Sequence, residues 1–506
     1  MLSALVPMIL GSCTLLPVIG DKPPELALPV PDSGPLVKAS RSLANGRAAG
    51  DSSFLLLNEA EEALKWRLAL IDSARSSIDI QLYLWHGGTS SELLYERAIQ
   101  AADRGVRVRI LVDDFLLRAS NVSVATLCRH HPNFEVRIFN PGRVRGSKIF
   151  GMTEMLANFN RLNRRMHNKT FTADRCMTIV GGRNIGDHYF GMDENYNFVD
   201  LDVLVAGPVV REVSDGFDKF WNDAASFPGM HLSKRDDPQL VELSRRGFKS
   251  TIEREKNGKL RGIGVGRGDW SGELAALRGE MVRGKARFIQ DDPDPSKDKR
   301  VVATQLKLLT RTQQSEIRLA SPYLLPSDEG VDQVAEMHAR GVDFRVIVPS
   351  LAANNHAAVH GHYEKSRQAL VEGGARLSEF RADPSEEVRD MVDVGGVRCE
   401  RVNFHLKAVV SERDKCFIGS LNIDPRAVNI NTECGLLIES PALAGEVADL
   451  LDELSSPQNS WQVKSDGKGG LTWESRGEVR SEPPSAGWVH RMMARVSGWL
   501  PIKNQL

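Results

Sequence analysis

Short apolar runs alternate with segments of helical period over most of the chain from residue 51 onward. Residues 77–85 indicate a strand, residues 91–104 repeat apolar side chains at helical spacing, and residues 106–112 form a second run of strand length. Strands that alternate with helices are typical of an α/β fold. The pattern therefore predicts an α/β protein.

The same order of elements returns in the second half of the chain. Residues 316–323 indicate a strand, residues 329–340 a helix and residues 342–348 another strand. Three pairs of positions match at offsets of 239, 236 and 238 residues: Ile78 with Ile317, Gly105 with Gly341, and His167 with His405. Agreement across unrelated positions indicates a duplication.

The repeat divides the chain into segments with different expected roles. Residues 51–209 and 291–455 should form two similar α/β lobes, joined by the charged, helical segment 210–290. Residues 21–50 are rich in Pro, Gly, Ala and Ser without a sustained period, so we expect a flexible linker there. Residues 456–506 form a C-terminal extension.

Both ends of the chain carry apolar segments that favour contact with a membrane. Residues 1–20 are too short to span a bilayer comfortably, and Leu10-Gly11-Ser12-Cys13 resembles a bacterial lipoprotein cleavage site that would leave Cys13 lipidated. Because no Lys or Arg precedes this run, a hydrophobic anchor or an ordinary start remains the alternative. Residues 488–500 predict an amphipathic helix, either at a membrane interface or docked on the core.

The composition narrows the classes of function. Lys plus Arg (65) and Asp plus Glu (66) nearly cancel, so the broad basic field of a nucleic-acid binder is missing and no nucleic-acid partner is expected. A mean hydropathy of -0.28 argues against a polytopic membrane protein. The six cysteines include no Cys-x-x-Cys pair, so the sequence gives no support for a structural zinc site.

Two His-x-Lys motifs carry the candidate chemistry. His167 with Lys169, and His405 with Lys407, occupy matching places in the two lobes. Residues at i and i+2 of a strand share a face, so each pair would project into one pocket. Each motif is followed by an apolar run and a Gly-x-x-Asn tetrapeptide, which ends at Asn184 in the first lobe and at Asn422 in the second. One such motif is weak evidence, because a histidine in a strand is more often an ordinary core or surface residue. The doubled pattern is specific.

Cleavage of a phosphodiester without a metal needs a nucleophile, a proton donor and fixed positive charge. One imidazole can attack phosphorus, while the other donates a proton to the leaving alcohol and later takes one from the incoming alcohol. Lys169 and Lys407 would hold the phosphate together with the amides of Asn184 and Asn422. The motifs therefore predict one active site shared by both lobes.

Four carboxylates are candidates for supporting roles. Glu433 lies 28 residues after His405, and Asp200 takes the matching place in the first lobe when the two following prolines are aligned. We expect Asp200 and Glu433 to fix the second nitrogen of a catalytic histidine. Asp174 and Glu412 close the motifs themselves and should brace a loop instead of touching substrate.

These segments resemble the phospholipase D superfamily, and more narrowly the C-type bacterial cardiolipin synthases. The resemblance rests on residues 166–190 and 419–440, on Ser321-Pro322-Tyr323 and on Leu500-Pro501-Ile502, and it covers nearly the whole chain from residue 50 onward. It implies two lobes about a pseudo-twofold axis, each a mixed sheet flanked by helices, in a monomer that acts as a pseudo-dimer. It also implies no metal and no cofactor.

The resemblance further implies a reaction and a place in the cell. A phosphatidyl group would pass to phosphatidylglycerol or a similar acceptor, giving cardiolipin, with phosphatidylethanolamine as another substrate phospholipid. The enzyme would work at a bacterial membrane surface, lipid-anchored and facing the periplasm. Hydrolysis of phospholipids, or a nuclease reaction, remains open with the same site, and so does an inactive lipid-binding protein.

The roles of the motif residues also follow from the resemblance. It makes His167 the nucleophile and His405 the general acid, although pseudo-symmetry leaves the two roles interchangeable from sequence. The resemblance also groups Asp174 and Glu412, the carboxylates of the two motifs, with the catalytic residues. Glu412 departs from the usual Asp and puts the bracing of the second loop in doubt.

Overall fold

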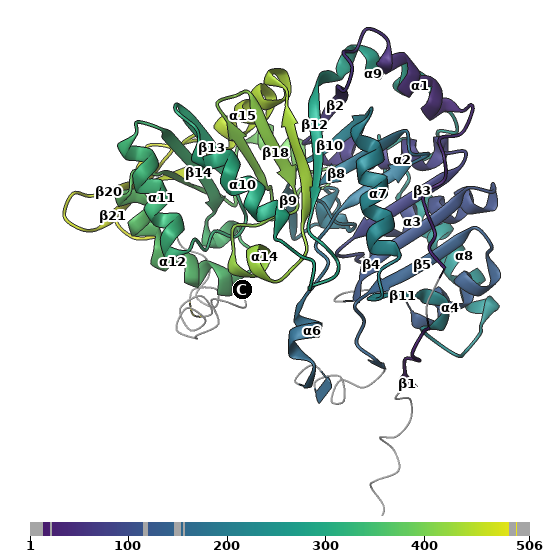
Figure 1. Cartoon of the computed structure of the whole chain (residues 1–506). Helices are drawn as coiled ribbons and strands as arrows, with labels where there is room; N and C mark the ends of the chain where they lie inside the picture. The colour runs from purple at the N-terminus through teal and green to yellow at the C-terminus, as the bar shows by residue number, and fades with distance from the viewer. Residues whose placement is uncertain are drawn as a thin grey trace, which may run out of the picture.

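The computed structural model describes residues 14–20, 23–114, 120–145, 153–154, 157–484 and 492. The first lobe is built on a mixed sheet with the strand order β11–β5–β4–β3–β7–β8–β10–β2, in which β3, β4 and β5 run parallel (Figure 1). The strands are β2 (Ser52–Leu57), β3 (Ser77–Leu82), β4 (Arg107–Asp113), β5 (Phe134–Phe139), β7 (Thr170–Ala173), β8 (Met177–Gly181), β10 (Asp202–Ala206) and β11 (Ser226–Pro228).

The second lobe repeats this sheet. Its order is β22–β21–β20–β15–β14–β13–β17–β18–β19–β12, and the parallel strands are again the three that follow one another along the chain, β13, β14 and β15. The strands are β12 (Val282–Gln290), β13 (Glu316–Ala320), β14 (Asp343–Pro349), β15 (Arg376–Phe380), β17 (Ala408–Ser411), β18 (Lys415–Gly419), β19 (Cys434–Glu439), β20 (Ser460–Ser465), β21 (Leu471–Ser475) and β22 (Glu478–Arg480). The predicted α/β fold with duplicated lobes is confirmed.

Strand β12 joins the two sheets. Val282, Arg283 and Gly284 pair with β2 of the first lobe, and the rest of the strand pairs with β19 of the second (Figure 1). A second junction is the parallel pair of β9 (Tyr196–Val199) and β16 (Arg401–Phe404). The lobes therefore share backbone hydrogen bonds, which fixes how the two halves of a site can face each other.

Helices cover both faces of the first sheet. On β4, Arg109 points to α7 (Val209–Trp221), whereas Ile110 and Val112 face α3 (Thr89–Asp103) and α4 (Asn121–His130). The alternation follows from the two-residue period of a strand. In the second lobe, α15 (Pro441–Ser455) takes the place of α7, and α10 (Val301–Arg311), α11 (Asp328–Ala339) and α12 (Ala357–Glu372) follow the order of α2 (Ala60–Ser73), α3 and α4.

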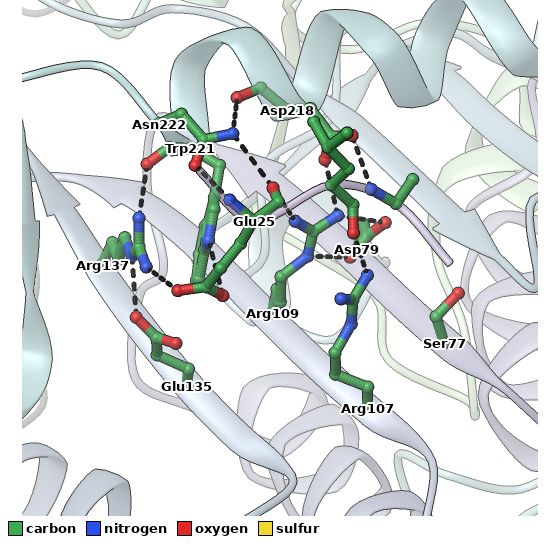
Figure 2. Close-up of polar contacts among 12 residues, drawn as sticks. Glu25, Ser77, Asp79, Arg107, Arg109, Glu135, Arg137, Asp218, Trp221 and Asn222 are labelled. Carbon is green, nitrogen blue, oxygen red and sulfur yellow. Dashed lines mark hydrogen bonds and ion pairs between the residues drawn. The ribbon is translucent and has the colours of Figure 1, made fainter. Parts of the chain in front are cut away.

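A network of ion pairs and hydrogen bonds attaches an N-terminal segment around Glu25 to the first lobe. Arg109 binds Asp79 and Asp218 with its guanidinium and also donates to the carbonyl of Glu25 at 3.1 Å (Figure 2). The backbone N–H of Glu25 donates to Asn222 at 2.8 Å. Arg109 is 1% exposed, so its ion pairs with the two aspartates form away from water, where charged groups need partners.

The flexible linker predicted for residues 21–50 is therefore corrected for residues 23–50. Beyond the contacts of Glu25, this segment contains α1 (Pro35–Ala44), whose Leu36, Val37 and Leu43 are buried. The Pro and Ser content concealed an amphipathic helix with proline at its first position, where proline is favoured.

The connecting segment 210–290 also differs in part from the prediction. It contains α8 (Pro238–Glu255) and α9 (Ser271–Glu280), as the helical period indicated, but it begins inside α7 of the first lobe and ends in strand β12. In the C-terminal extension, β20 to β22 extend the second sheet. Cys13 and nearly all of the predicted helix 488–500 lie outside the described residues. Within the described residues, no helix combines the length and apolar character that a bilayer span requires.

Candidate active site

The two histidines are held by backbone bonds from the opposite lobe. The N–H of His167 donates to the carbonyl of Thr432 at 2.9 Å, and the N–H of His405 donates to the carbonyl of Val199 at 2.8 Å. The residue before each histidine pairs in parallel with a residue of the other lobe, through the bridge of Met166 to Thr432 and through β16 with β9. The two contacts are pseudo-symmetric, and they place the histidine of each His-x-Lys motif at the interface between the lobes.

Each imidazole binds a carboxylate across that interface. Nδ1 of His167 lies 3.0 and 2.9 Å from the two carboxylate oxygens of Glu433, and Nδ1 of His405 lies 2.6 Å from Asp200. Both carboxylates are fully buried, and the histidines are 7% and 5% exposed. With Nδ1 engaged, Nε2 is the nitrogen left for chemistry. The structure thus brings together all four of these predicted residues, pairing each carboxylate with the histidine of the other lobe.

Two buried lysines supply the positive charge. Nζ of Lys169 donates to the carbonyl of His167 at 2.5 Å, and Nζ of Lys407 lies 2.9 Å from Nδ1 of His405. Burial lowers the pKa of Lys169 to about 8 and that of Lys407 to about 7. An anion between them would oppose this effect and favour their charged forms. The site is therefore built for an anionic group.

The two carboxylates differ in their ionisation. Burial raises the pKa of Glu433 to about 8, although Lys169 and a hydrogen bond from Ser420 oppose the rise. Burial also disfavours the charge of Asp200, but His405 and Lys407 outweigh it and leave the pKa of this carboxyl below its usual value. At neutral pH the site therefore holds an ionised Asp200 and a proton on Glu433.

The imidazoles themselves are neutral at neutral pH. Burial, then the charge of Lys407, lowers the pKa of His405 to about 3. Burial and the two lysines also hold the pKa of His167 well below its usual value. A neutral imidazole whose Nε2 carries no proton is the form that can attack phosphorus.

A difference of one residue accompanies the difference between the carboxylates. The hydroxyl of Ser420 donates to Glu433 and accepts the N–H of Cys434 at 3.0 Å. The matching position in the first lobe is Gly182, where a Cβ would lie 2.2 Å from an oxygen of Asp200. Only glycine fits there, so Asp200 packs against backbone while Glu433 has a hydroxyl partner.

The two amides of the Gly-x-x-Asn motifs have different surroundings. Oδ1 of Asn184 accepts the N–H of Leu84 at 3.1 Å, and its Nδ2 donates to the hydroxyl of Tyr189 at 3.0 Å. Oδ1 of Asn422 is buried and has no hydrogen-bond partner among the described residues. Asn184 is thus tied to the loop after β3, whereas Asn422 retains an unsatisfied amide oxygen.

Aromatic rings that the sequence did not single out pack against both histidines. The ring centroid of Tyr83 lies 4.9 Å from that of His167, while those of Phe198 and Tyr189 lie 4.8 and 5.4 Å from that of His405. Phe198 and Tyr189 belong to the first lobe, so the second histidine is enclosed by residues far away in sequence. No local pattern identifies such residues.

The motif carboxylates Asp174 and Glu412 lie at hairpin turns, at the far ends of β7 and β17 from the histidines. Asp174 accepts backbone N–H groups of Arg75, Ser76 and Ser77 at 2.7 to 3.0 Å. Glu412 accepts the backbone N–H groups of residues 314 and 315 at 2.8 and 3.1 Å. This position is a brace outside the site, which corrects their grouping with the catalytic residues.

The two braces should differ in their contribution to stability. Asp174 is fully buried, so Asp174→Ala leaves buried N–H groups without acceptors and is expected to lower the free energy of unfolding by about 3 kcal/mol. Glu412 is exposed, so water can replace it, and Glu412→Ala should cost less than about 1 kcal/mol. Urea denaturation of both variants measures the difference. Equal losses would show that exposure does not govern these turns.

Fold and site together define a duplicated enzyme with a single composite active site, to which each lobe gives one histidine, one lysine and the carboxylate that holds the other lobe's histidine. Comparison with known proteins shows which family shares this architecture. A family model described as "Cardiolipin synthase, PLD-like domain" matches residues 68–221 and 306–455, one match in each lobe.

Relatives and a solved structure agree with the family match. Cardiolipin synthase C of Escherichia coli is 32% identical over 90% of this chain and 96% of its own length. Cardiolipin synthase A of Pseudomonas entomophila is 24% identical over 83% of this chain and 72% of its own length. The crystal structure of phosphatidylserine synthase from Haemophilus influenzae shares the fold, with a TM-score of 0.59 at 15% identity, over 93% of this chain and all of that one. The chain belongs to the phospholipase D superfamily and, within it, to the C-type cardiolipin synthases.

Proposed function

We propose that this protein transfers a phosphatidyl group from one phospholipid to another through a covalent phosphohistidine, producing cardiolipin. The observation that carries the proposal is the pair of imidazoles, each held through Nδ1 by a buried carboxylate of the opposite lobe, beside two buried lysines. Two histidines of this kind supply both a nucleophile and a proton donor. Membership of the cardiolipin synthase family favours phosphatidylglycerol as donor and acceptor.

The first half-reaction forms the covalent intermediate. Nε2 of His167 attacks phosphorus, the bond from phosphorus to the glycerol oxygen breaks, and that oxygen takes the proton from Nε2 of His405. Lys169 and Lys407 hold the phosphoryl oxygens, whose charge raises the proton affinity of His405. Nε2 of His405 therefore takes up a proton from solvent when substrate binds, before the attack, and releases it when product leaves. We assign the attack to His167 on the resemblance to the family, since the geometry is nearly symmetric.

The second half-reaction returns the enzyme to its starting state. The terminal hydroxyl of a second phosphatidylglycerol gives its proton to Nε2 of His405, and its oxygen forms the new bond to phosphorus. The bond between phosphorus and His167 breaks, and the electron pair returns to Nε2. Two phosphatidylglycerols thus give one cardiolipin and one glycerol. A lipidated Cys13 would keep the protein at the membrane surface on the periplasmic side, where both substrates lie in one plane.

An assay with defined vesicles tests this reaction. The full-length protein in vesicles of phosphatidylglycerol should release cardiolipin and glycerol in equal amounts, measured by mass spectrometry of the lipids and enzymatic detection of glycerol. Added phosphatidylethanolamine serves as a donor if free ethanolamine appears together with cardiolipin. Phosphatidic acid without cardiolipin would make the protein a phospholipase, and the absence of any turnover would leave a lipid-binding protein.

A further inference from the structure

A mostly apolar cavity of about 340 Å³ lies inside the first lobe, on the face of the sheet opposite α7. Strands β4 and β5 form its floor through Ile110 and Val136, α3 and α4 form its walls through Tyr95 and Leu127, and α8 covers it through Phe248. Helix α8 lies beside α3 and α4 (Figure 1). The cavity is partly open to solvent, and its size and mostly apolar lining offer room for an apolar group.

The cavity is connected to the active site through one short stretch of backbone. Trp85, His86 and Gly87 line it, and they follow Tyr83, whose ring contacts His167, after one intervening residue. The N–H of His86 donates to the carbonyl of Ile185, the residue after Asn184 of the site. Two residues of extended chain span about 7 Å, so the lining begins at Trp85, about that far along the backbone from the tyrosine that packs on His167.

The helix that covers the cavity belongs to the connecting segment 210–290. Helix α8 lies between the two matches to the family model, so it is not part of the shared catalytic halves. None of its residues is fully buried. It is held to α3 by Arg245, which binds Glu96 at 3.2 Å and Asp103 at 2.9 Å. These ion pairs keep α8 over the cavity without filling the space beneath it.

We propose that this cavity binds one fatty acyl chain of a substrate phospholipid while its phosphate lies at His167. The inference rests on the proposed function for the identity of the lipid. An apolar cavity of about 150 Å³ accepts benzene, so this one has room for roughly a dozen chain carbons. The guanidinium of Arg245 in the lining is already paired with Glu96 and Asp103, and Glu92 adds a carboxylate. This lining favours an esterified chain over the carboxylate of a free fatty acid.

Variants that fill the cavity provide the test, and the same helix offers a matched control. Ser244 of α8 and Ser91 of α3 line the cavity, so Ser244→Phe and Ser91→Leu should occupy it. Ser250 is exposed on α8, so Ser250→Phe adds the same ring outside the cavity. Thermal unfolding checks that each variant folds, and the two filling variants act from different helices, so one suffices if the other fails to fold.

Binding is measured by isothermal titration in a His405→Ala background, which prevents turnover. The probes are palmitoyl lysophosphatidylglycerol, glycerophosphoglycerol without a chain, and palmitate. Ser244→Phe or Ser91→Leu should weaken the lysophospholipid at least tenfold, because apolar burial is lost, while Ser250→Phe stays within twofold and glycerophosphoglycerol is unaffected. Unchanged binding of the lysophospholipid in the filling variants would overturn the proposal. Palmitate that binds more tightly than the lysophospholipid would overturn the assignment to an esterified substrate.

This experiment separates the cavity from the reaction. If the vesicle assay yields no cardiolipin but the filling variants still lose the lysophospholipid, the cavity is an acyl site and the proposed transfer is wrong. If cardiolipin forms but the filling variants bind the probe normally, the transfer stands and the acyl site is wrong.

Discussion

Replacement of either His167 or His405 by alanine is expected to lower the rate of cardiolipin formation by roughly 10⁴- to 10⁶-fold. The first change removes the atom that forms the bond to phosphorus, and the second removes the proton that the leaving glycerol requires. Both histidines sit on the lobe interface with Nδ1 committed to a carboxylate, which leaves Nε2 of each for the reaction. The measurement is the initial rate in phosphatidylglycerol vesicles.

Two comparisons make this result specific. His130 is exposed and pairs with Asp236 of the connecting segment, so His130→Ala should keep the native rate within twofold. Residues that act in one step are strongly non-additive, so the double variant of His167 and His405 should be no slower than the slower single variant. A single variant that retains a tenth of the native activity would exclude the covalent mechanism.

The duplication could be predicted from sequence because it depends on short-range patterns. Strand and helix periods repeat with a nearly constant offset, and the pairings of Ile78 in β3 and Ile317 in β13 occupy matching places in the two sheets. The residues of the site could be predicted for the same reason, because His167 and His405 carry the same motif. Asp200 was identified only because its lobe aligns with that of Glu433.

The pairing across the lobes could not be predicted in this way. An alignment places Glu433 and Asp200 at equivalent positions, but it does not tell which histidine each one reaches. That depends on how the sheets meet at β12 and on the parallel bridge of Met166 with Thr432. The contacts of Glu25 with the first lobe were missed for a related reason, because its partners lie nearly 200 residues away and leave no local period.

The difference between the pKa values of Glu433 and Asp200 distinguishes the two histidines, which the nearly symmetric geometry does not. With a pKa of about 8, Glu433 keeps a proton at neutral pH, while Asp200 is ionised. His167 can present a free electron pair on Nε2 only after its pair with Glu433 gives up that proton. If His167 is the nucleophile, the ionisation of Glu433 should therefore raise native kcat/KM as the pH passes about 8, while the loss of charge on Lys169 and Lys407 in the same range opposes this gain. If His167 were the acid instead, the same ionisation would remove activity.

Glu433→Gln and Asp200→Asn are expected to resolve the two roles. The side-chain amide introduced by Glu433→Gln would accept a hydrogen bond from Nδ1 of His167 at every pH, and it does not ionise. The ratio of native to variant kcat/KM should therefore climb from about tenfold at pH 6.5 to at least about a hundredfold at pH 9.5, with its midpoint near 8. Asp200→Asn removes a charge that is present throughout this range, so its ratio should be at least about a hundredfold and flat. Both variants keep the native lysines, although each loses one of the charges that raise the pKa values of these lysines. Steady-state kinetics in mixed micelles from pH 6 to 9.5 give both curves. A ratio for Glu433→Gln that falls through pH 8 would exchange the roles of His167 and His405, and a flat one would remove the Glu433 proton from the mechanism.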